Sequence, residues 1–292
     1  MDISLALGGG GSRGYAHVGV LRCLLAEGFR IRAIAGTSAG GIVAAAHAAG
    51  YSPDEMEVEF SKIDQSKLFA RSPEEGPSIM GLSGASKLLE EYFGDRTFAD
   101  LSIPCAVVAV DLKAGKEVHL HEGRVVDALL ATAAVPGVFP PRQFGDLHLV
   151  DGAVLNPVPV SVARSMATTL PVVAVILGGI AETKRGFDNL PLRVPVPALL
   201  VKRLTHTRVA QAFNIFLQSV DVGSRQLAEL RLLADNPDVV IRPDVSGVGL
   251  LDKVDVSKIV RMGEAAAEAA LPELRKAVAW PNRFRRRVFT RR

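Results

Sequence analysis

This chain of 292 residues contains few cysteines and no long apolar runs. Its two cysteines, Cys23 and Cys105, are too few for a disulfide framework or a cysteine metal site, so we expect reduced thiols. No uninterrupted apolar run approaches the roughly 18–20 residues that a membrane-spanning helix needs. The first residues, Met1–Ser4, lack a basic segment, so we expect no secretory signal and a cytoplasmic protein.

Acidic residues are missing from the C-terminal end of the sequence. Arg283–Arg292 contains six arginines, and because the whole chain carries a formal net charge of +3, the rest carries −3. Phe284, Val288 and Phe289 lie between these arginines. We expect the basic tail, 281–292, either to contact an anionic membrane surface, which would place the protein at the inner membrane surface, or to be solvated. No basic patch continues into the rest of the chain, so we do not expect nucleic acid to bind.

The whole chain is 48% apolar, which is typical of a globular protein, and it begins with a strand–helix–strand–helix order. Ile3–Leu7 is apolar without alternation, as in a strand covered on both faces, and Tyr15–Glu27 has helical spacing. Ile31–Ala35 predicts a second strand and Ala39–Ala49 a second helix. This order predicts an α/β fold with a mainly parallel central sheet flanked by helices.

Further elements follow along the chain. The charged insert 51–99 is expected to be irregular apart from a helix at Ala85–Phe93, and to form a lid or cap or a plain surface excursion. The pattern predicts strands at Cys105–Val110, Glu117–Leu120, Leu147–Val150, Val172–Leu177 and Val239–Ile241, and helices at Val125–Ala134 and Val256–Val278. Apolar residues recurring from Val209 through Phe213, Phe216 and Leu230 to Ala234 predict one long amphipathic helix.

Gly36-Thr37-Ser38-Ala39-Gly40 stands between the second predicted strand and helix. A G-x-S-x-G sequence on such a turn exposes a serine hydroxyl as a nucleophile. The turn is strained, so a side chain at Gly36 or Gly40 is expected to collide with the returning chain. The pattern therefore predicts Ser38 as a nucleophile.

A serine nucleophile needs a base, which is usually a histidine held by an acid. Of six histidines, only His206 follows Asp151 in the chain, and its basic neighbours favour a solvated helix face. His119 and His121 could suggest a metal pair, but no third ligand is spaced nearby, so we expect edge-strand residues and no metal. Asp151, at a strand end before Gly152, is therefore either the base itself, in a Ser–Asp dyad, or a turn aspartate bonded locally.

Gly8–Gly14 satisfies the G-x-G-x-x-G pattern of dinucleotide-binding loops. That function needs an acidic residue at the end of the next strand, where this chain has Gly36-Thr37-Ser38 instead. The alternative is an oxyanion hole made by the backbone N–H groups of Gly9, Gly10 and Gly11 at a helix N-terminus. We favour this alternative and expect no cofactor.

With these motifs in this order, the chain resembles the patatin-like phospholipases in their compact bacterial form. The resemblance runs from about Ile3 to Ala270, which predicts one patatin-like domain over 1–280. It rests on Leu7–Leu21, Gly36–Gly40, Pro136–Pro141, Val150–Ala153 with Asn156–Pro159, and the stretch from Asn236-Pro237-Asp238 to Gly249–Asp252.

The resemblance implies a serine lipid acyl hydrolase of the phospholipase A type, with Ser38 as nucleophile, Asp151 as base and no histidine. It further implies oxyanion donors at Gly9–Gly11, with Arg13 as a loop anchor or headgroup contact and His17 in a structural role.

Three departures from the family pattern stand out. Ala153 replaces a commoner glycine, Ala131-Thr132-Ala133 replaces a frequent Arg-Ala-Ser run beneath the site, and 53–75 has no clear counterpart. The alternatives are an esterase or thioesterase acting on shorter acyl groups, and a non-catalytic regulator that binds acyl ligands. The oligomeric state is left open.

Overall fold

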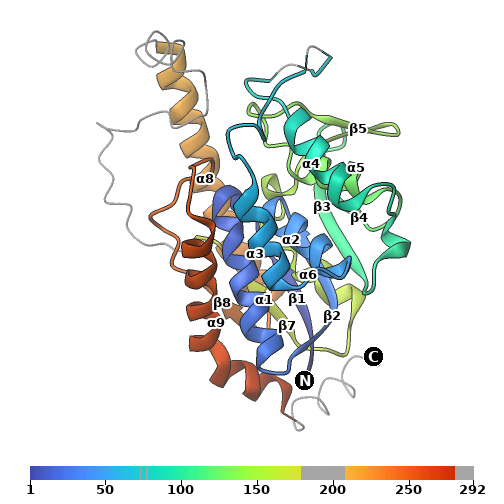
Figure 1. Cartoon of the computed structure of the whole chain (residues 1–292), viewed down its shortest axis with the longest axis vertical. Helices are drawn as coiled ribbons and strands as arrows, with labels where there is room; N and C mark the ends of the chain where they lie inside the picture. Colours follow the sequence, from blue (N-terminus) through green and yellow to red (C-terminus); the bar gives the residue numbers. More distant parts are fainter. Residues whose placement is uncertain (73, 77, 179–207, 280–292) are drawn as a thin grey trace.

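The molecule is built around one mixed β-sheet with helices on both faces (Figure 1). The structure, a computed structural model, describes residues 1–292 except 73, 77, 179–207 and 280–292. Within these residues the sheet has eight strands in the order β5–β6–β3–β2–β1–β7–β8, with β4 paired to β3. The strands are β1 (Asp2–Leu7), β2 (Arg30–Thr37), β3 (Cys105–Asp111), β4 (Lys116–Leu120), β5 (Arg142–Phe144), β6 (Leu147–Asp151), β7 (Val172–Val175) and β8 (Val239–Ile241).

The strand pairs at the centre of the sheet are parallel. β1 pairs with β2 and β7, β2 pairs with β3, and β7 pairs with β8, all in parallel. The pairs β3–β4, β3–β6 and β5–β6 are antiparallel. The predicted α/β fold with a mainly parallel central sheet is therefore confirmed.

Two hydrophobic cores lie on the two faces of this sheet. The helices are α1 (Ala16–Ala26), α2 (Ala39–Ala48), α3 (Pro53–Lys62), α4 (Ser83–Phe93), α5 (Val125–Thr132), α6 (Val160–Met166), α8 (Arg208–Asp235) and α9 (Val256–Val278). Leu5 and Leu7 of β1 pack into the larger core beneath α1, α2, α5 and α9, whereas Ala6 packs into the smaller core beneath α6 and α8. This alternation follows from the two-residue period of a strand.

The C-terminal helices lie where the hydrophobic pattern predicts them. α9 spans the residues expected, and α8 agrees with the predicted long helix to within a residue at each end. The prediction of which residues form the buried face of α8 is wrong in part, because Phe216 and Leu230 are 43% and 62% exposed. Ala228 and Leu232 are buried instead, because they are the residues that α8 turns toward α6 and the sheet.

The irregular start predicted for the insert 51–99 is wrong, because α3 forms there. Ser52 accepts a hydrogen bond from the backbone N–H of Glu55, whose carboxylate accepts one from the backbone N–H of Ser52. Pro53 at the first helical position completes a strong N-terminal signal that was readable in the sequence. The short elements β5 and α6 were also not predicted, whereas α4 begins only two residues before the predicted helix.

Candidate active site

Ser38 occupies the turn between β2 and α2. Its φ of 54° and ψ of −126° lie in a region that side-chain-bearing residues rarely adopt. A Cβ on Gly36 would overlap the backbone at Gly40, and a Cβ on Gly40 would overlap the carbonyl oxygen of Leu7. The turn therefore has the strained geometry that the G-x-S-x-G spacing predicts, and glycine is required on both sides of Ser38.

The segment Gly8–Gly14, called the glycine loop below, follows β1. It includes the start of a 3-10 turn, η1 (Gly11–Tyr15), that leads into α1. A Cβ on Gly9 would lie 3.4 Å from the Cβ of Ser38, which places the loop directly beside this serine. Gly11 has a φ of +56°, and a Cβ there would overlap the carbonyl oxygen of Leu250. Leu250 therefore packs closely over a loop backbone that only glycine allows.

The three predicted oxyanion donors differ in availability. The N–H of Gly9 donates to the carbonyl oxygen of Pro157 at 2.9 Å, so this donor is already used. Across the described parts of the chain, the N–H groups of Gly10 and Gly11 donate to no protein acceptor. Two of the three predicted donors thus have no protein acceptor among the described residues.

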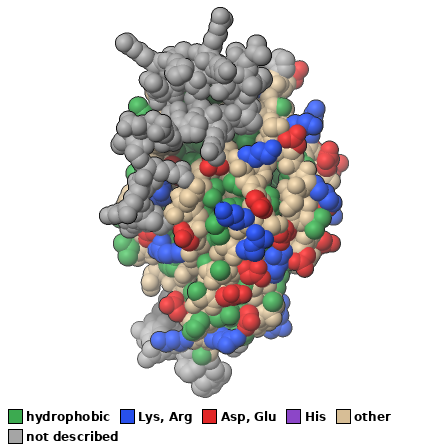
Figure 2. All heavy atoms as spheres, turned by 60° about the vertical axis from the view of Figure 1, so that its left-hand side comes forward, with side chains coloured by type: hydrophobic (Ala, Val, Ile, Leu, Met, Phe, Trp, Pro, Cys, Tyr) green, Lys and Arg blue, Asp and Glu red, His purple; other side chains and the backbone are tan. Residues whose placement is uncertain are grey.

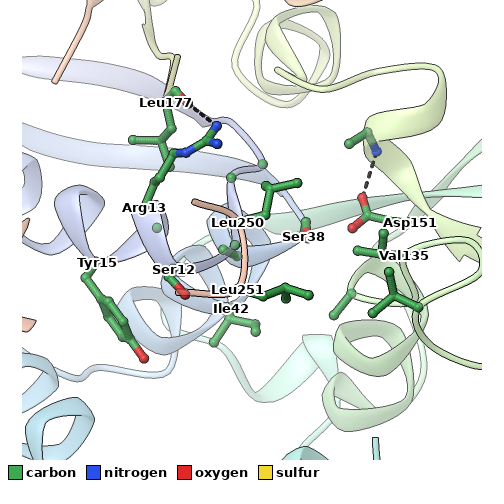
Figure 3. Close-up of a pocket in the computed structure, with 18 of the residues that line it drawn as sticks. Ser12, Arg13, Tyr15, Ser38, Ile42, Val135, Asp151, Leu177, Leu250 and Leu251 are labelled. Atoms are coloured by element: carbon green, nitrogen blue, oxygen red, sulfur yellow. Dashed lines mark hydrogen bonds between the residues drawn. The ribbon is translucent and has the colours of Figure 1, made fainter. Parts of the chain in front are cut away.

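Asp151 ends β6 and lines the same cavity as Ser38 (Figure 3). Its Oδ1 accepts a hydrogen bond from the backbone N–H of Ala153 at 2.8 Å, and the residue is 3% exposed. Burial raises the pKa of Asp151 to about 6, although hydrogen bonds from Ser38 and Ala153 act to lower it. At neutral pH this carboxylate is therefore charged, and it is a stronger base than an exposed aspartate.

Arg13 is held on several sides by the protein. Its guanidinium donates to both carboxylate oxygens of Asp221 in α8, each at 3.1 Å, and to the carbonyl oxygen of Val248 at 2.7 Å. It also contacts the carbonyl oxygen of Leu177 (Figure 3), and Arg225 donates to the same Asp221. These contacts support the anchor role over the headgroup role.

None of the histidines within the described ranges lines the cavity that contains Ser38. His17 is fully buried with Nε2 2.8 Å from the carbonyl oxygen of Gly8, and burial lowers its pKa to about 4. His119 pairs with Glu117 on β4. His206, the candidate triad histidine, lies outside the described residues.

A cavity of about 1320 Å³ contains Ser38, Asp151 and the glycine loop. Ala39, Ile42, Val43 and Ala46 line it, which is the i, i+3, i+4, i+7 face of α2. The cavity therefore follows α2 for about two turns, or roughly 10 Å, away from Ser38. Its opposite walls are apolar side chains of α3, α4 and the segments near them, including Met56, Phe60, Phe69, Leu89 and Phe93.

The predicted basic tail, Arg283–Arg292, lies outside the described residues, so its membrane contact stays a prediction. On the face shown in Figure 2, basic and acidic side chains of the described residues are interspersed. In the part of the chain that is described, no helix combines the length and the apolar character needed to cross a membrane.

Sequence comparisons identify relatives of this chain. An uncharacterized NTE family protein of Mycobacterium bovis is 31% identical over 280 residues, which cover 92% of this chain and 46% of that protein. Another, from Mycobacterium tuberculosis, is 37% identical over 61% of this chain and 49% of its own length. Patatin-like phospholipase domain-containing protein 7 of Rattus norvegicus is 31% identical over 62% of this chain and 14% of its own length. The chain thus spans about half the length of the mycobacterial relatives.

The fold also resembles a solved structure, VipD from Legionella pneumophila. The TM-score is 0.51 with 11% sequence identity, over 92% of this chain and 66% of that one. Residues 5–164 match the sequence model described as patatin-like phospholipase, a range that includes Ser38 and Asp151. Because this match covers more than half of the 292 residues, the chain belongs to the patatin-like phospholipase family.

Proposed function

We propose that this protein is a serine lipid acyl hydrolase that cleaves fatty-acyl esters through Ser38 and Asp151. The observation that carries the proposal is the shared cavity. A serine on a strained turn and a buried carboxylate with a raised pKa line one large apolar space, together with two free backbone N–H donors. This combination supplies a nucleophile, a base and an oxyanion site in one place.

The proposed reaction begins when Asp151 takes the proton of the Ser38 hydroxyl while Oγ attacks the ester carbonyl carbon. The carbonyl oxygen becomes an oxyanion that accepts hydrogen bonds from Gly10 and Gly11. Collapse of this intermediate breaks the ester bond, and Asp151 returns the proton to the departing alcohol. Water then attacks the acyl-enzyme while Asp151 takes a proton from it. The bond between the acyl carbon and Ser38 Oγ breaks, Asp151 gives the proton back to Oγ, and the fatty acid leaves.

The apolar part of the cavity supports an acyl chain as the bound group. It begins beside Ser38 and continues along α2 beneath the insert 51–99, whose helices α3 and α4 supply its outer wall. Each methylene that an acyl chain buries there contributes about 0.8 kcal/mol. We therefore propose that this insert acts as the cap of an acyl-chain groove, defined as the cavity lined by Ala39, Ile42, Val43 and Ala46 of α2.

A fluorophosphonate probe tests the proposed function directly, because it labels only an activated serine. We expect the protein to be labelled at Ser38 and to release fatty acid from a panel of phospholipids and neutral esters. Labelling with turnover of short esters alone would favour the esterase alternative. A folded protein that binds acyl ligands without being labelled would overturn the proposal in favour of a non-catalytic regulator.

Ala46→Phe tests the acyl-chain groove. Ala46 is 6% exposed and lies about two turns of α2 from Ser38, so a phenyl ring there would fill the distal groove. Excluding two methylenes costs about 1.6 kcal/mol, so we expect kcat/KM for long acyl esters to fall tenfold or more while short esters are unaffected.

The measurement is a chain-length series of p-nitrophenyl esters. Val58→Phe, on an exposed position of α3 outside the cavity, is the matched control and should leave the series unchanged. An equal loss for all chain lengths in Ala46→Phe would show that the groove does not hold the acyl chain.

A further inference from the structure

Thr132, the last residue of α5, is fully buried directly beneath Ser38. Its Oγ1 accepts a hydrogen bond from the backbone N–H of Ser38 at 2.8 Å and donates one to the carbonyl oxygen of Val108. A hydroxyl has one proton to donate, and here both the donor and an acceptor position are used. The side chain thus bonds the backbone of Ser38 to that of β3.

The contact with β3 also connects Ser38 to the strand that carries Asp151. Val108 pairs with Thr37, the residue before Ser38, and the next residue of β3, Ala109, pairs with Asp151. Val108 and Ala109 of β3 therefore lie beside the last residues of β2 and β6. The Thr132 hydroxyl donates its hydrogen bond to Val108 at this place in β3.

A second hydrogen bond from the same segment reaches Asp151. The backbone N–H of Asp151 donates to the carbonyl oxygen of Ala134 at 2.9 Å. Thr132 and Ala134, two residues apart at the end of α5, thus accept the backbone N–H groups of Ser38 and of Asp151 respectively. This short segment holds both residues from one side.

The turn at Ser38 makes such a support necessary. β2 ends at Thr37, so no sheet partner is available for the Ser38 N–H, and an unpaired N–H in a buried position is strongly unfavourable. A positive φ at a non-glycine residue persists only where the surroundings hold it. Thr132 supplies both the acceptor and a rigid attachment to β3.

Resting on the proposed dyad, we propose that Thr132 is a positioning residue, which sets the approach of the Ser38 hydroxyl to Asp151 through its hydrogen bonds to Ser38 and Val108. The step that depends on it is proton transfer from Ser38, because a misplacement of about 1 Å in such a step can cost about a hundredfold in rate. Substrate binding along α2 does not involve this side chain, so KM should be insensitive to it.

The experiment compares Thr132→Val, which keeps the shape and removes the hydroxyl, with Thr132→Ser, which keeps the hydroxyl. We expect Thr132→Val to lower both kcat and the fluorophosphonate labelling rate at least tenfold, with KM within twofold of wild type. Thr132→Ser should stay within threefold of wild type. Because the Ser38 hydrogen bond lowers the pKa of Asp151, the acidic limb of the pH–rate profile should also move to higher pH in Thr132→Val.

Ser4→Ala is the matched control, because Ser4 is a fully buried hydroxyl on β1 that donates to the carbonyl oxygen of Ala163, outside the cavity. It should lower the thermal midpoint and leave the labelling rate unchanged. If Thr132→Val does not fold, Thr132→Cys replaces it, because cysteine is close to serine in size and its thiol is a weak hydrogen-bonding group. Thr132→Cys should then be labelled at least fivefold more slowly than Thr132→Ser.

The outcomes separate this inference from the proposed function. A wild-type protein that is not labelled overturns the dyad and the role of Thr132 together. A labelled wild type with an equally fast Thr132→Val, or equal rates for the Cys and Ser variants, overturns the role of Thr132 alone. Equal slowing in Ser4→Ala would show a general effect of lost buried hydrogen bonds, and would also overturn it.

Discussion

Ser38→Ala is expected to reduce ester hydrolysis by at least about 1,000-fold while the protein stays folded. The substitution removes only Oγ, the atom that we propose forms the acyl bond. Alanine carries the same Cβ as serine, so the backbone at φ 54° is no more strained than in the wild type. The hydrogen bond from the Ser38 N–H to Thr132 is also retained, so the thermal midpoint should change little.

Turnover of a phospholipid and of a short p-nitrophenyl ester should be measured beside the thermal midpoint. Ser165→Ala is the control, because this serine of α6 lies away from the cavity and bonds only the carbonyl oxygen of Val162 among the described residues. Retention of more than a few per cent of activity in a folded Ser38→Ala protein would place the active site elsewhere.

Asp151→Asn is expected to lower activity by about 100-fold to 10,000-fold, because an amide cannot take the serine proton. We expect the same substitution to stabilise the fold at neutral pH. The pKa of Asp151 is raised from 3.8 to about 6, so keeping it charged in the folded protein costs about 3 kcal/mol at pH 8. Asparagine carries no such cost and can still accept the N–H of Ala153.

The pH dependence of this stability difference follows from the two pKa values. Between pH 3.8 and about 6 the folded wild type binds more protons than the unfolded chain, so its stability falls as pH rises through this window. Asp151→Asn should therefore be more stable than wild type by up to about 3 kcal/mol at pH 8, and by nothing below about pH 4. His17, whose pKa is lowered to about 4, has the opposite pH dependence, but it cancels because both proteins contain it.

Urea unfolding at pH 4, 6 and 8 measures the difference. A variant that is less stable than wild type at pH 8 would show that the charged Asp151 carboxylate does not destabilise the folded protein. Full activity in a folded Asp151→Asn protein would remove Asp151 from the proposed mechanism and would make His206 the candidate base.

Local features of the chain were readable from the sequence, since they depend on residues that are neighbours along it. The G-x-S-x-G turn is an example, because Gly36 and Gly40 flank Ser38 and a Cβ on Gly36 would overlap the backbone of Gly40, four residues along the chain. The overlap of a Cβ on Gly40 with Leu7 of β1, in contrast, depends on the tertiary structure. α9 was predicted to its last residue from helical spacing alone. The start of α3 was equally local, and the Ser52–Glu55 capping pattern would have revealed it.

The contacts that complete the candidate site join residues far apart in the chain. The Ser38–Thr132 hydrogen bond spans 94 positions and the Arg13–Asp221 pair spans 208. The sequence showed only that Thr132 departs from the family pattern and that Arg13 was either an anchor or a headgroup contact. No local pattern could show that Pro157 occupies the N–H of Gly9.

The sequence by itself therefore determined most of the order of strands and helices, the serine turn and the candidate nucleophile, because backbone sterics and hydrophobic periodicity act over a few residues. The choice of Asp151 as candidate base rested on the resemblance to the family. Only the tertiary structure decided which glycine donors are free, how far burial raises the pKa of Asp151, and where the apolar groove runs. Those properties depend on hydrogen bonding, desolvation and packing by segments that folding brings together.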